Sequence, residues 1–284
     1  MTTHSSPFEA ASGTINSTKP IRVIVSGARG KMGREFVKTV LTDPQLELVG
    51  VVTGTSTDET VNQFFQFDSA PKLGFDTSLS DLLAREKPDV CVDLTHPGVV
   101  FENAKAIVEA NCRPVIGTTG LTTEQLNWLE DALKARNLGG MVVPNFAIGA
   151  VLLMKFAQEA ARYFDHAEII ELHHNQKADA PSGTALKTAE LMRQSQAHFG
   201  SSNSPEKESL PGARGANGPA DIRIHSVRLP GFVAHQEVIL GSPGQILTLR
   251  HDSMDRNCFM PGIALCVKKT MSLNGLVYGM EHIL

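Results

Sequence analysis

The segment from Glu171 to Thr184 holds the densest group of chemically reactive side chains in the sequence. Two adjacent histidines, His173 and His174, come near its start, and Lys177 follows them. An imidazole can act as an acid near neutral pH, and a lysine ammonium group binds carboxylates. We therefore interpret His173 as a candidate acid, with Lys177 and His174 as donors to an anionic substrate.

The second half of the same segment predicts an anion-binding turn at the start of a helix. Pro181 and Gly183 favour a rigid turn, and Ser182 or Thr184 can cap the helix that follows. The first N–H groups of a helix are free, and the helix dipole attracts negative charge there. Together with Lys177, this turn is expected to bind a carboxylate.

Other interpretations of this segment compete with that one. A metal site is disfavoured, because His173 and His174 are sequential and no third ligand follows at helical or hairpin spacing. The histidines could instead be ordinary surface residues, with Ser182 serving only as a helix cap. Ser182 is also a poor candidate nucleophile, because it lacks the G-x-S-x-G sequence of a nucleophile elbow. We expect no metal at this segment.

A glycine-rich turn near the start of the chain predicts a dinucleotide site. Gly27, Gly30 and Gly33 follow a short β-branched run at residues 21–25, and apolar residues at helical spacing come after them. Glycine lets the backbone approach a pyrophosphate, which the helix N-terminus attracts. The alternative is a tight turn with only a structural role, but the flanking strand and helix favour dinucleotide binding.

The residues after the next predicted strand bear on the choice of cofactor. An acidic residue there normally binds the ribose hydroxyls of NAD. This sequence has Thr53 and a run of Thr, Ser and Gly, with no carboxylate until Asp58. Arg29, Lys31 and Arg34 could supply positive charge to a 2′-phosphate, or could simply be solvated at the start of a helix. We expect NADPH to be preferred, with NADH as the alternative.

The elements that position these residues alternate regularly in the first half of the chain. Strands are predicted at residues 21–25, 46–52, 90–94, 115–117 and 141–143. Helices are predicted after the glycine turn and at residues 80–86, 99–110 and 123–135. Such alternation is typical of an α/β fold, a Rossmann-type doubly wound parallel sheet with helices on both faces.

The pattern changes near Pro144, and a second, α+β domain is predicted from there. A helix at 149–161, a strand at 167–172 and a helix ending near 196 are followed by a Gly/Pro/Ser-rich stretch at 198–220, interpreted as a mobile loop or flap. Residues 221–228, 232–240 and 245–250 are predicted to form antiparallel strands, followed by a helix at 261–272 and an apolar tail. The second sheet is therefore expected to be mixed or antiparallel.

Composition excludes several classes of function. The chain has 26 Lys and Arg against 30 Asp and Glu, a net charge of −4, which argues against a dedicated nucleic-acid binder. The longest apolar stretch, residues 147–154, is far shorter than the ~20 residues that cross a bilayer. Four scattered cysteines without a C-x-x-C pair favour a reduced, cytoplasmic protein. Residues 1–20 carry no secretory signal and are expected to form a flexible tail.

Several motifs together resemble those of one enzyme family. They lie at residues 26–33, 115–120, 144–146, 171–177 and 179–185. The combination of His-His-x-x-Lys with Asp-Ala-Pro-Ser-Gly-Thr is highly specific, and the chain resembles the 4-hydroxy-tetrahydrodipicolinate (dihydrodipicolinate) reductases from about Ile21 to Leu284. The resemblance implies NAD(P)H-dependent reduction of a cyclic imine dicarboxylate in the diaminopimelate pathway of lysine biosynthesis.

The resemblance also implies roles for individual residues. His173 would be the catalytic histidine and Lys177 the catalytic lysine that donates the proton. The residues expected to bind the substrate are His174, Lys177, Ser182, Gly183 and Thr184. The residues expected to bind the cofactor are Gly27, Ala28, Arg29, Gly30, Lys31, Met32, Gly33, Thr53, Gly117, Thr118, Thr119, Val143, Pro144, Asn145 and Phe146.

At the level of the whole chain, the resemblance implies two domains and a homotetramer. Residues 21–148 and about 261–284 would form the dinucleotide-binding domain, and residues 149–260 the substrate domain, whose sheet would assemble the tetramer. Nucleic acid and membrane are not expected partners. The second-strand acidic residue of several members is missing here, which puts NADH use in doubt, and residues 201–216 have no clear counterpart in the family.

Two rival functions stay open from sequence alone. The first is another two-domain nicotinamide oxidoreductase, acting on a sugar or an amino acid. The second is a non-catalytic sensor that binds the dinucleotide and a partner. Sugar and amino-acid dehydrogenases of the first kind lack the Asp-Ala-Pro-Ser-Gly-Thr turn. A sensor of the second kind would have no need of His173 and Lys177 beside an anion-binding turn.

Overall fold

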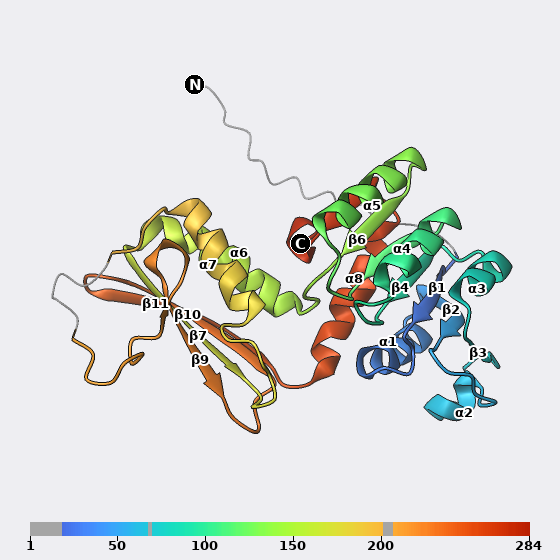
Figure 1. Ribbon diagram of the computed structural model, residues 1–284, viewed down its shortest axis with the longest axis horizontal. Coiled ribbons are helices and arrows are strands. Elements are labelled where there is room, and N and C mark those ends of the chain that lie inside the picture. Colours follow the sequence, from blue (N-terminus) through green and yellow to red (C-terminus); the bar gives the residue numbers. More distant parts are fainter. Residues whose placement is uncertain (1–18, 68–69, 201–206) are drawn as a thin grey trace.

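The computed structural model describes residues 19–67, 70–200 and 207–284. These form two β-sheets side by side along the long axis of the molecule, each with its own helices (Figure 1). The tail expected over residues 1–20 lies outside the described residues apart from its last two positions.

The first sheet has seven strands in the order β12-β6-β5-β4-β1-β2-β3, and all of its strand pairs are parallel. The strands are β1 (Ile21–Ser26), β2 (Leu46–Val52), β3 (Phe75–Asp76), β4 (Val90–Asp93), β5 (Arg113–Ile116), β6 (Gly139–Val142) and β12 (Gly275–Tyr278). The central strands are β-branched and buried on both faces, which is typical of a sheet covered by helices on both sides.

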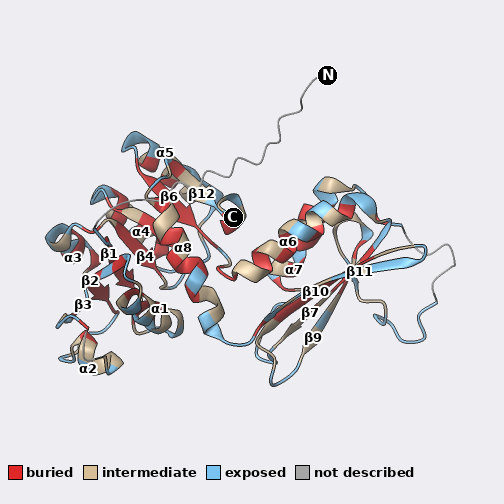
Figure 2. Cartoon of the chain, turned by 180° about the vertical axis from the view of Figure 1, so that it is seen from behind, coloured by how far each residue is buried: buried red, intermediate tan, exposed pale blue. Residues whose placement is uncertain are grey.

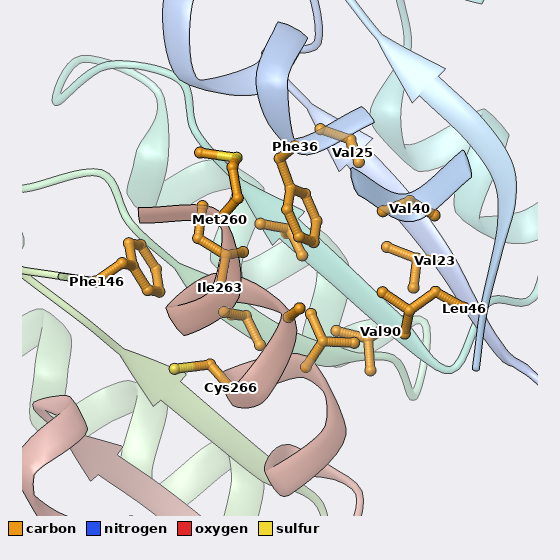
Figure 3. Close-up of a cluster of buried hydrophobic side chains, with 14 of the residues drawn as sticks. Val23, Val25, Phe36, Val40, Leu46, Val90, Phe146, Met260, Ile263 and Cys266 are labelled. Atoms are coloured by element: carbon orange, nitrogen blue, oxygen red, sulfur yellow. The ribbon is translucent and has the colours of Figure 1, made fainter. Parts of the chain in front are cut away.

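Helices cover both faces of this sheet, so the doubly wound prediction is confirmed. One face carries α1 (Lys31–Thr42) and α8 (Met260–Thr270), whereas α3 (Leu79–Glu86), α4 (Val100–Glu109) and α5 (Thr123–Ala135) cover the other. Figure 3 shows Phe36 of α1, Ile263 of α8 and Val23 of β1 in the same cluster of buried side chains. Full burial of a side chain of this size contributes about 1.5–3 kcal/mol, so these contacts fix α1 firmly on the sheet.

Three elements of this half were not predicted. The short strand β3 and the helix α2 (Val61–Phe65) lie beyond the edge of β2. The apolar tail contains β12, which pairs with β6 and returns the end of the chain to the first sheet. A strand this short shows too little alternation of polar and apolar residues to be recognised by periodicity.

The second sheet is mixed, with the order β11-β10-β7-β9-β8. Its strands are β7 (His166–His173), β8 (Ala216–Asn217), β9 (Arg223–Arg228), β10 (Ala234–Ser242) and β11 (Gln245–Ser253). The antiparallel prediction holds for the pairing of β10 with β11. β9 does not pair with β10 and instead lies between β7, to which it is parallel, and β8, to which it is antiparallel. The chain reaches β9 from β7 through a helical crossover, and such a connection produces a parallel pair.

Two helices cover one face of the second sheet. They are α6 (Ile148–Ala160) and α7 (Gly183–Ser195), and their apolar side chains pack on Ile169 and Val238. Figure 2 shows buried positions on these helices and exposed positions along the edge strand β11. Short 3-10 turns complete the described chain: η1 (Ala161–Tyr163), η2 (Pro219–Asp221), η3 (Arg256–Phe259) and η4 (Met280–His282). Across the described ranges, no helix combines the length and apolar character needed to span a membrane.

The stretch predicted to be a mobile loop or flap, residues 198–220, falls partly outside the described residues, at 201–206. Its flanks pack against the second sheet. Phe199 is buried, and its N–H donates to the carbonyl of Ala220 over 3.0 Å. The buried Phe199 side chain anchors this flank, whereas residues 207–213 are exposed, and the mobility of the stretch stays a prediction.

Candidate active site

A cavity of about 560 Å³ lies between the two sheets. Its lining residues are Thr119, Pro144, Asn145, Val151, Met154, His173, Lys177, Asp179, Ser182, Gly183, Thr184, Lys187, Tyr278, Gly279, Met280 and Glu281. The fold thus brings four of the five predicted substrate residues, all but His174, together with three of the predicted cofactor residues, Thr119, Pro144 and Asn145. A smaller neighbouring cavity of about 210 Å³ shares His173 and Asn145 and extends to His235 and His251.

His173 is the last residue of β7, and its side chain forms a hydrogen bond with Glu171 of the same strand. Because alternate residues of a strand share a face, Glu171 and His173 both lie on the side covered by α6 and α7. The Nδ1 atom of His173 lies 2.5 Å from Oε2 of Glu171. A carboxylate only accepts, so Nδ1 carries the hydrogen and Nε2 is left for other partners.

The surroundings of His173 lower its pKa below the ordinary histidine value. Burial is the largest cause, and the positive charges of Lys177 and Arg228 act in the same direction. The hydrogen bond and negative charge of Glu171 oppose the shift without cancelling it. The imidazole is therefore mostly neutral at neutral pH, and a proton held on it is readily given up.

Lys177 lies in the turn after β7 and pairs with an exposed carboxylate. Its Nζ is 2.7 and 2.8 Å from the two carboxylate oxygens of Asp179. This hydrogen bond from Lys177 is the main cause of the lowered pKa of Asp179. Since the Asp179 side chain is 62% exposed, its ion pair contributes only about 0–1 kcal/mol. An incoming carboxylate could replace Asp179 at small cost.

The start of α7 provides the predicted anion-binding turn. The side-chain oxygen of Ser182 accepts from the N–H of Ala185 over 3.1 Å and caps the helix. The N–H groups of Gly183 and Thr184, in the first turn, have no acceptor within the helix. Asn145 donates through Nδ2 to Oγ1 of Thr184 over 3.4 Å. This contact joins the connection between the sheets to the anion-binding turn.

His174 lies differently from the other predicted substrate residues. It is exposed and does not line either of the two cavities described above. Its backbone carbonyl accepts from the N–H of Lys177 over 3.2 Å and closes the turn. Its part in substrate binding stays a prediction.

The glycine turn between β1 and α1 has the geometry of a pyrophosphate cradle. Gly27 has φ +82°, and a Cβ there would lie 2.6 Å from the carbonyl oxygen of Leu94. A Cβ on Gly33 would lie 2.1 Å from the carbonyl oxygen of Gly27. The helix that follows begins at Gly30 without a side-chain cap. The turn lies between β1, β2 and β4, where the strand order reverses, so these residues fit a dinucleotide.

Other predicted cofactor residues serve the packing of this region. The side chains of Val143 and Phe146 are buried in the core, where Figure 3 shows Phe146 beside Met260 and Ile263. A Cβ on Gly117 would collide with the Phe146 ring at 2.6 Å. The side chains of Val143 and Phe146 therefore support the fold, and the missing side chain of Gly117 leaves room for the Phe146 ring.

Buried polar contacts fix the neighbouring loop that carries Thr118. The Thr118 hydroxyl donates to the fully buried carboxylate of Asp93 over 2.6 Å, and the amide of Asn103 donates to the other oxygen over 2.7 Å. Thr53 is also buried and donates its N–H to the carbonyl of Asp76. The Asp93 contacts hold the 117–119 loop at the carboxyl end of β4.

Arginines gather at the far end of the glycine turn, beside aromatic rings. The guanidinium carbons of Arg29 and Arg34 each lie 4.6 Å from the centre of the Phe64 ring. Arg29 also lies 5.6 Å from the Phe75 ring and pairs with Glu59 over 3.3 Å. Sequence reasoning found the arginines but missed these aromatic residues, although the Phe-Phe pair after the second strand was a visible signal.

Further residues of the cavity were missed because no motif marks them. Tyr278 ends β12 and Glu281 follows it, and both reach the cavity only because β12 joins the first sheet. Glu281 lies 3.9 Å from Nζ of Lys187 on α7. Glu171 and Arg228 were also missed, since they are 57 positions apart and meet only through the pairing of β7 with β9.

The four cysteines are free thiols. Burial raises the pKa of Cys266 to about 12 and raises the pKa of Cys91 and Cys112 as well. These buried thiols are therefore poor nucleophiles near neutral pH. Among the residues that the structure describes, no three His, Cys, Asp or Glu side chains are grouped so that they could hold a metal ion.

Comparison with known proteins identifies the family. Models described as the N-terminus and the C-terminus of dihydrodipicolinate reductase match residues 21–146 and 149–284. A relative from Listeria monocytogenes serotype 4b, named 4-hydroxy-tetrahydrodipicolinate reductase, is 51% identical over 266 residues, covering 93% of this chain and 100% of the relative. One of the same name from Synechococcus elongatus is 48% identical over 271 residues, covering 93% and 99%.

A solved structure agrees with these relatives. The dipicolinate-bound dihydrodipicolinate reductase from Paenisporosarcina sp. TG-14 superposes with a TM-score of 0.84 at 47% identity, covering 93% of this chain and 100% of that one. The likeness thus extends over both sheets. The chain belongs to the dihydrodipicolinate reductase family.

Proposed function

We propose that this protein uses NAD(P)H to reduce 4-hydroxy-tetrahydrodipicolinate to tetrahydrodipicolinate, in the diaminopimelate pathway of lysine biosynthesis. The observation that carries the proposal is the shared cavity. There His173, Lys177 and the free N-terminus of α7 face the loop at Thr119 from the dinucleotide-binding half. Both curated relatives carry the name of this activity, and the solved relative binds dipicolinate, a planar ring with two carboxylates.

The cationic groups of the cavity suit a substrate with two carboxylates. Lys177 binds one carboxylate after leaving Asp179, and the N–H groups of Gly183 and Thr184 bind the other. Loss of the ring hydroxyl as water leaves a carbon–carbon double bond conjugated to the imine, and the reduced nicotinamide, when bound, supplies a hydride to that conjugated ring. Negative charge then builds toward the ring nitrogen, and one proton, from Lys177 or from protonated His173, neutralises it.

A coupled assay tests this function. The preceding synthase of the pathway generates the unstable substrate in place, and the nicotinamide absorbance follows its reduction. We expect absorbance to fall only when synthase, this protein and reduced cofactor are all present. Oxidation of sugars or amino acids in its place would favour the rival dehydrogenase. Dinucleotide binding without turnover of the cyclic imine would favour the sensor.

For the cofactor, we propose that NADPH is preferred over NADH. No carboxylate stands at Thr53 to repel a 2′-phosphate, and Arg29 and Arg34 stack on Phe64 beside the glycine turn. Arg29→Ala and Arg34→Ala should each raise KM for NADPH roughly 10–100-fold, the effect of losing a charged hydrogen bond of about 1.5–3 kcal/mol. KM for NADH should change little.

The control for that comparison is Lys38→Ala. Lys38 is also a cation of α1 but pairs with Glu35 on the exposed helix surface, so both KM values should be unchanged. Similar specificity constants for the two cofactors in the unsubstituted protein would refute the preference.

We also propose that the protein is a cytoplasmic homotetramer. Free cysteines suit a reducing compartment. Ile170, Ile239 and Ile246 lie on the face of the second sheet opposite α6 and α7, and Ile246 is 75% exposed. Burying this face against further copies would remove that apolar surface from water. Light scattering should give about four times the 30.6-kDa chain mass, and a monomer would contradict the proposal.

A further inference from the structure

Glu171 is a fully buried carboxylate in direct contact with the candidate acid. Its Oε2 accepts hydrogen bonds from Nδ1 of His173 over 2.5 Å and from Nη1 of Arg228 over 2.9 Å. Its Oε1 accepts hydrogen bonds from Nη2 of Arg228 over 2.7 Å and from the N–H of Ser182 over 3.2 Å. The carboxylate therefore touches the imidazole, a guanidinium group and the residue that caps α7.

Arg228 connects the same carboxylate to the lysine-bearing turn. It is the residue of β9 that pairs in register with His173 of β7. Both of its terminal nitrogens donate to the Glu171 carboxylate. Its Nη2 also donates to the backbone carbonyl of Asp179 over 2.7 Å. One ion pair thus ties together the end of β7, the strand beside it and the turn from Lys177 to Ser182.

We propose that Glu171 and Arg228 form a positioning pair that orients His173 and, through Asp179 and Ser182, holds the anion-binding turn in register with it. The inference rests on the proposed function of His173. Neither residue lines either of the two cavities described above, so both act through their neighbours.

Stability alone is a poor explanation for this pair. Removing two charges from water costs several kcal/mol per ion, and buried pairs often stabilise a fold less than apolar residues of the same size. Orientation is a better explanation. The Glu171 carboxylate fixes the hydrogen of His173 on Nδ1 and holds the ring by a short contact.

The charges around His173 predict a pH signature for this role. They are Glu171 from its own strand, Arg228 from β9 and Lys177 from the turn, while His235 and His251 lie across the smaller cavity. Glu171 is the group among the three charges that raises the pKa of the imidazole. Removing its charge should move the limb of the kcat–pH profile that reports His173 to lower pH.

The test compares Glu171→Gln with Glu168→Gln. Glu168 lies on the same strand and likewise contacts a histidine and an arginine, His225 at 2.7 Å and Arg214 at 2.5 Å, but on the opposite face of the sheet. Glu171→Gln should lower kcat about 10-fold or more near neutral pH and shift the His173 limb downward. NADPH affinity should be unchanged. Glu168→Gln should leave both kcat and the limb unchanged.

Arg228→Lys tests the second part of the proposed role, which is to hold the anion-binding turn in place. The lysine keeps a positive charge but cannot form the bidentate pair with Glu171 or the hydrogen bond to the Asp179 carbonyl. It should weaken dipicolinate binding, measured by calorimetry, by about 10-fold, with a smaller shift of the pH limb than Glu171→Gln produces. Thermal melting and light scattering of every variant identify loss of fold or assembly.

The outcomes separate the two proposals. Absence of imine reduction by the unsubstituted protein would refute the proposed function itself. If that protein is active but folded Glu171→Gln keeps its kcat and its pH limb, the positioning role is refuted. A lower melting temperature with an unmoved limb would show a structural role only, and would overturn the inference as well.

Discussion

His173 and Lys177 face one cavity, and each contacts a carboxylate close in sequence. The two carboxylates differ in burial: Glu171 is fully buried, whereas the Asp179 side chain is 62% exposed. A buried partner fixes a ring in place, while an exposed partner is exchanged at little cost. We expect His173 to stay oriented throughout the reaction and Lys177 to move from Asp179 to the substrate.

Replacing either residue should affect chemistry without affecting the cofactor. His173→Ala and Lys177→Ala should lower kcat roughly 100- to 10,000-fold, the usual contribution of an acid in the transition state. The Kd for NADPH should hardly change, because the glycine turn belongs to the other sheet. Stopped-flow kinetics and fluorescence titration measure the two quantities.

An exposed histidine provides the control for these variants. His198, whose side chain is 81% exposed, lies outside both cavities, so His198→Ala should keep the original kcat. Turnover by His173→Ala and Lys177→Ala at the original rate would show that the acid lies elsewhere.

At the level of elements, two helix N-termini suit the two proposed ligands. α1 begins at the glycine turn, where it fits a pyrophosphate, and α7 begins at Ser182, where its free N–H groups suit a carboxylate. The first start relies on glycine, since side chains at Gly27 or Gly33 would collide with the backbone. The second relies on a side-chain cap and has open space at Gly183.

This difference predicts the effect of adding a single methyl group to the glycine turn. Gly33→Ala places a Cβ 2.1 Å from the carbonyl oxygen of Gly27, so α1 must move away from the turn. We expect a loss of about 1–3 kcal/mol in the free energy of unfolding and a marked loss of NADPH affinity. Denaturant titration and calorimetry measure both effects.

Gly241→Ala is the matched substitution for that experiment. A Cβ at Gly241 would have no neighbour within 4 Å, so stability should stay within about 0.5 kcal/mol and cofactor affinity should be unchanged. Equal behaviour of the two variants would contradict the steric explanation.

At the level of the whole molecule, the cavity exists because two separate sheets meet around it. The chain passes from the first sheet to the second after β6 and returns after β11 through α8 (Figure 1). β12 then brings Tyr278 and Glu281 to the cavity wall. Both halves therefore contribute to one site, and closure of the halves on the ligands would exclude water from it.

Protonation of the partly buried histidines should destabilise the whole molecule in acid. Burial lowers the pKa of both His173 and His251 below the ordinary value. The unfolded chain therefore binds more protons, and stability is lost as pH falls from about 6.5 through the folded-state values. Melting temperatures measured across this range should decrease with acid, and His251→Asn should reduce the slope. A melting temperature that rises on acidification would contradict this expectation.

Local sequence determined the elements whose pattern lies within one short stretch. The strand, glycine turn and helix from Ile21 to Thr42 were predictable because β-branched runs, glycine positions and helical spacing act between near neighbours. The grouping of residues from Glu171 to Thr184 around one cavity was predictable for the same reason. Its reactive side chains are adjacent in sequence, and a cap and a turn already imply where they lie.

Tertiary structure alone decided which distant residues meet. Pairing of β9 with β7 brings Arg228 to Glu171, and the pairing of β12 with β6 brings Glu281 to the cavity. Strand order depends on how whole helices and sheets bury their apolar faces, and no local period encodes it. The sequence therefore showed His173 and Lys177 as candidate groups, whereas packing across the chain decided that Glu171 and Arg228 meet behind His173.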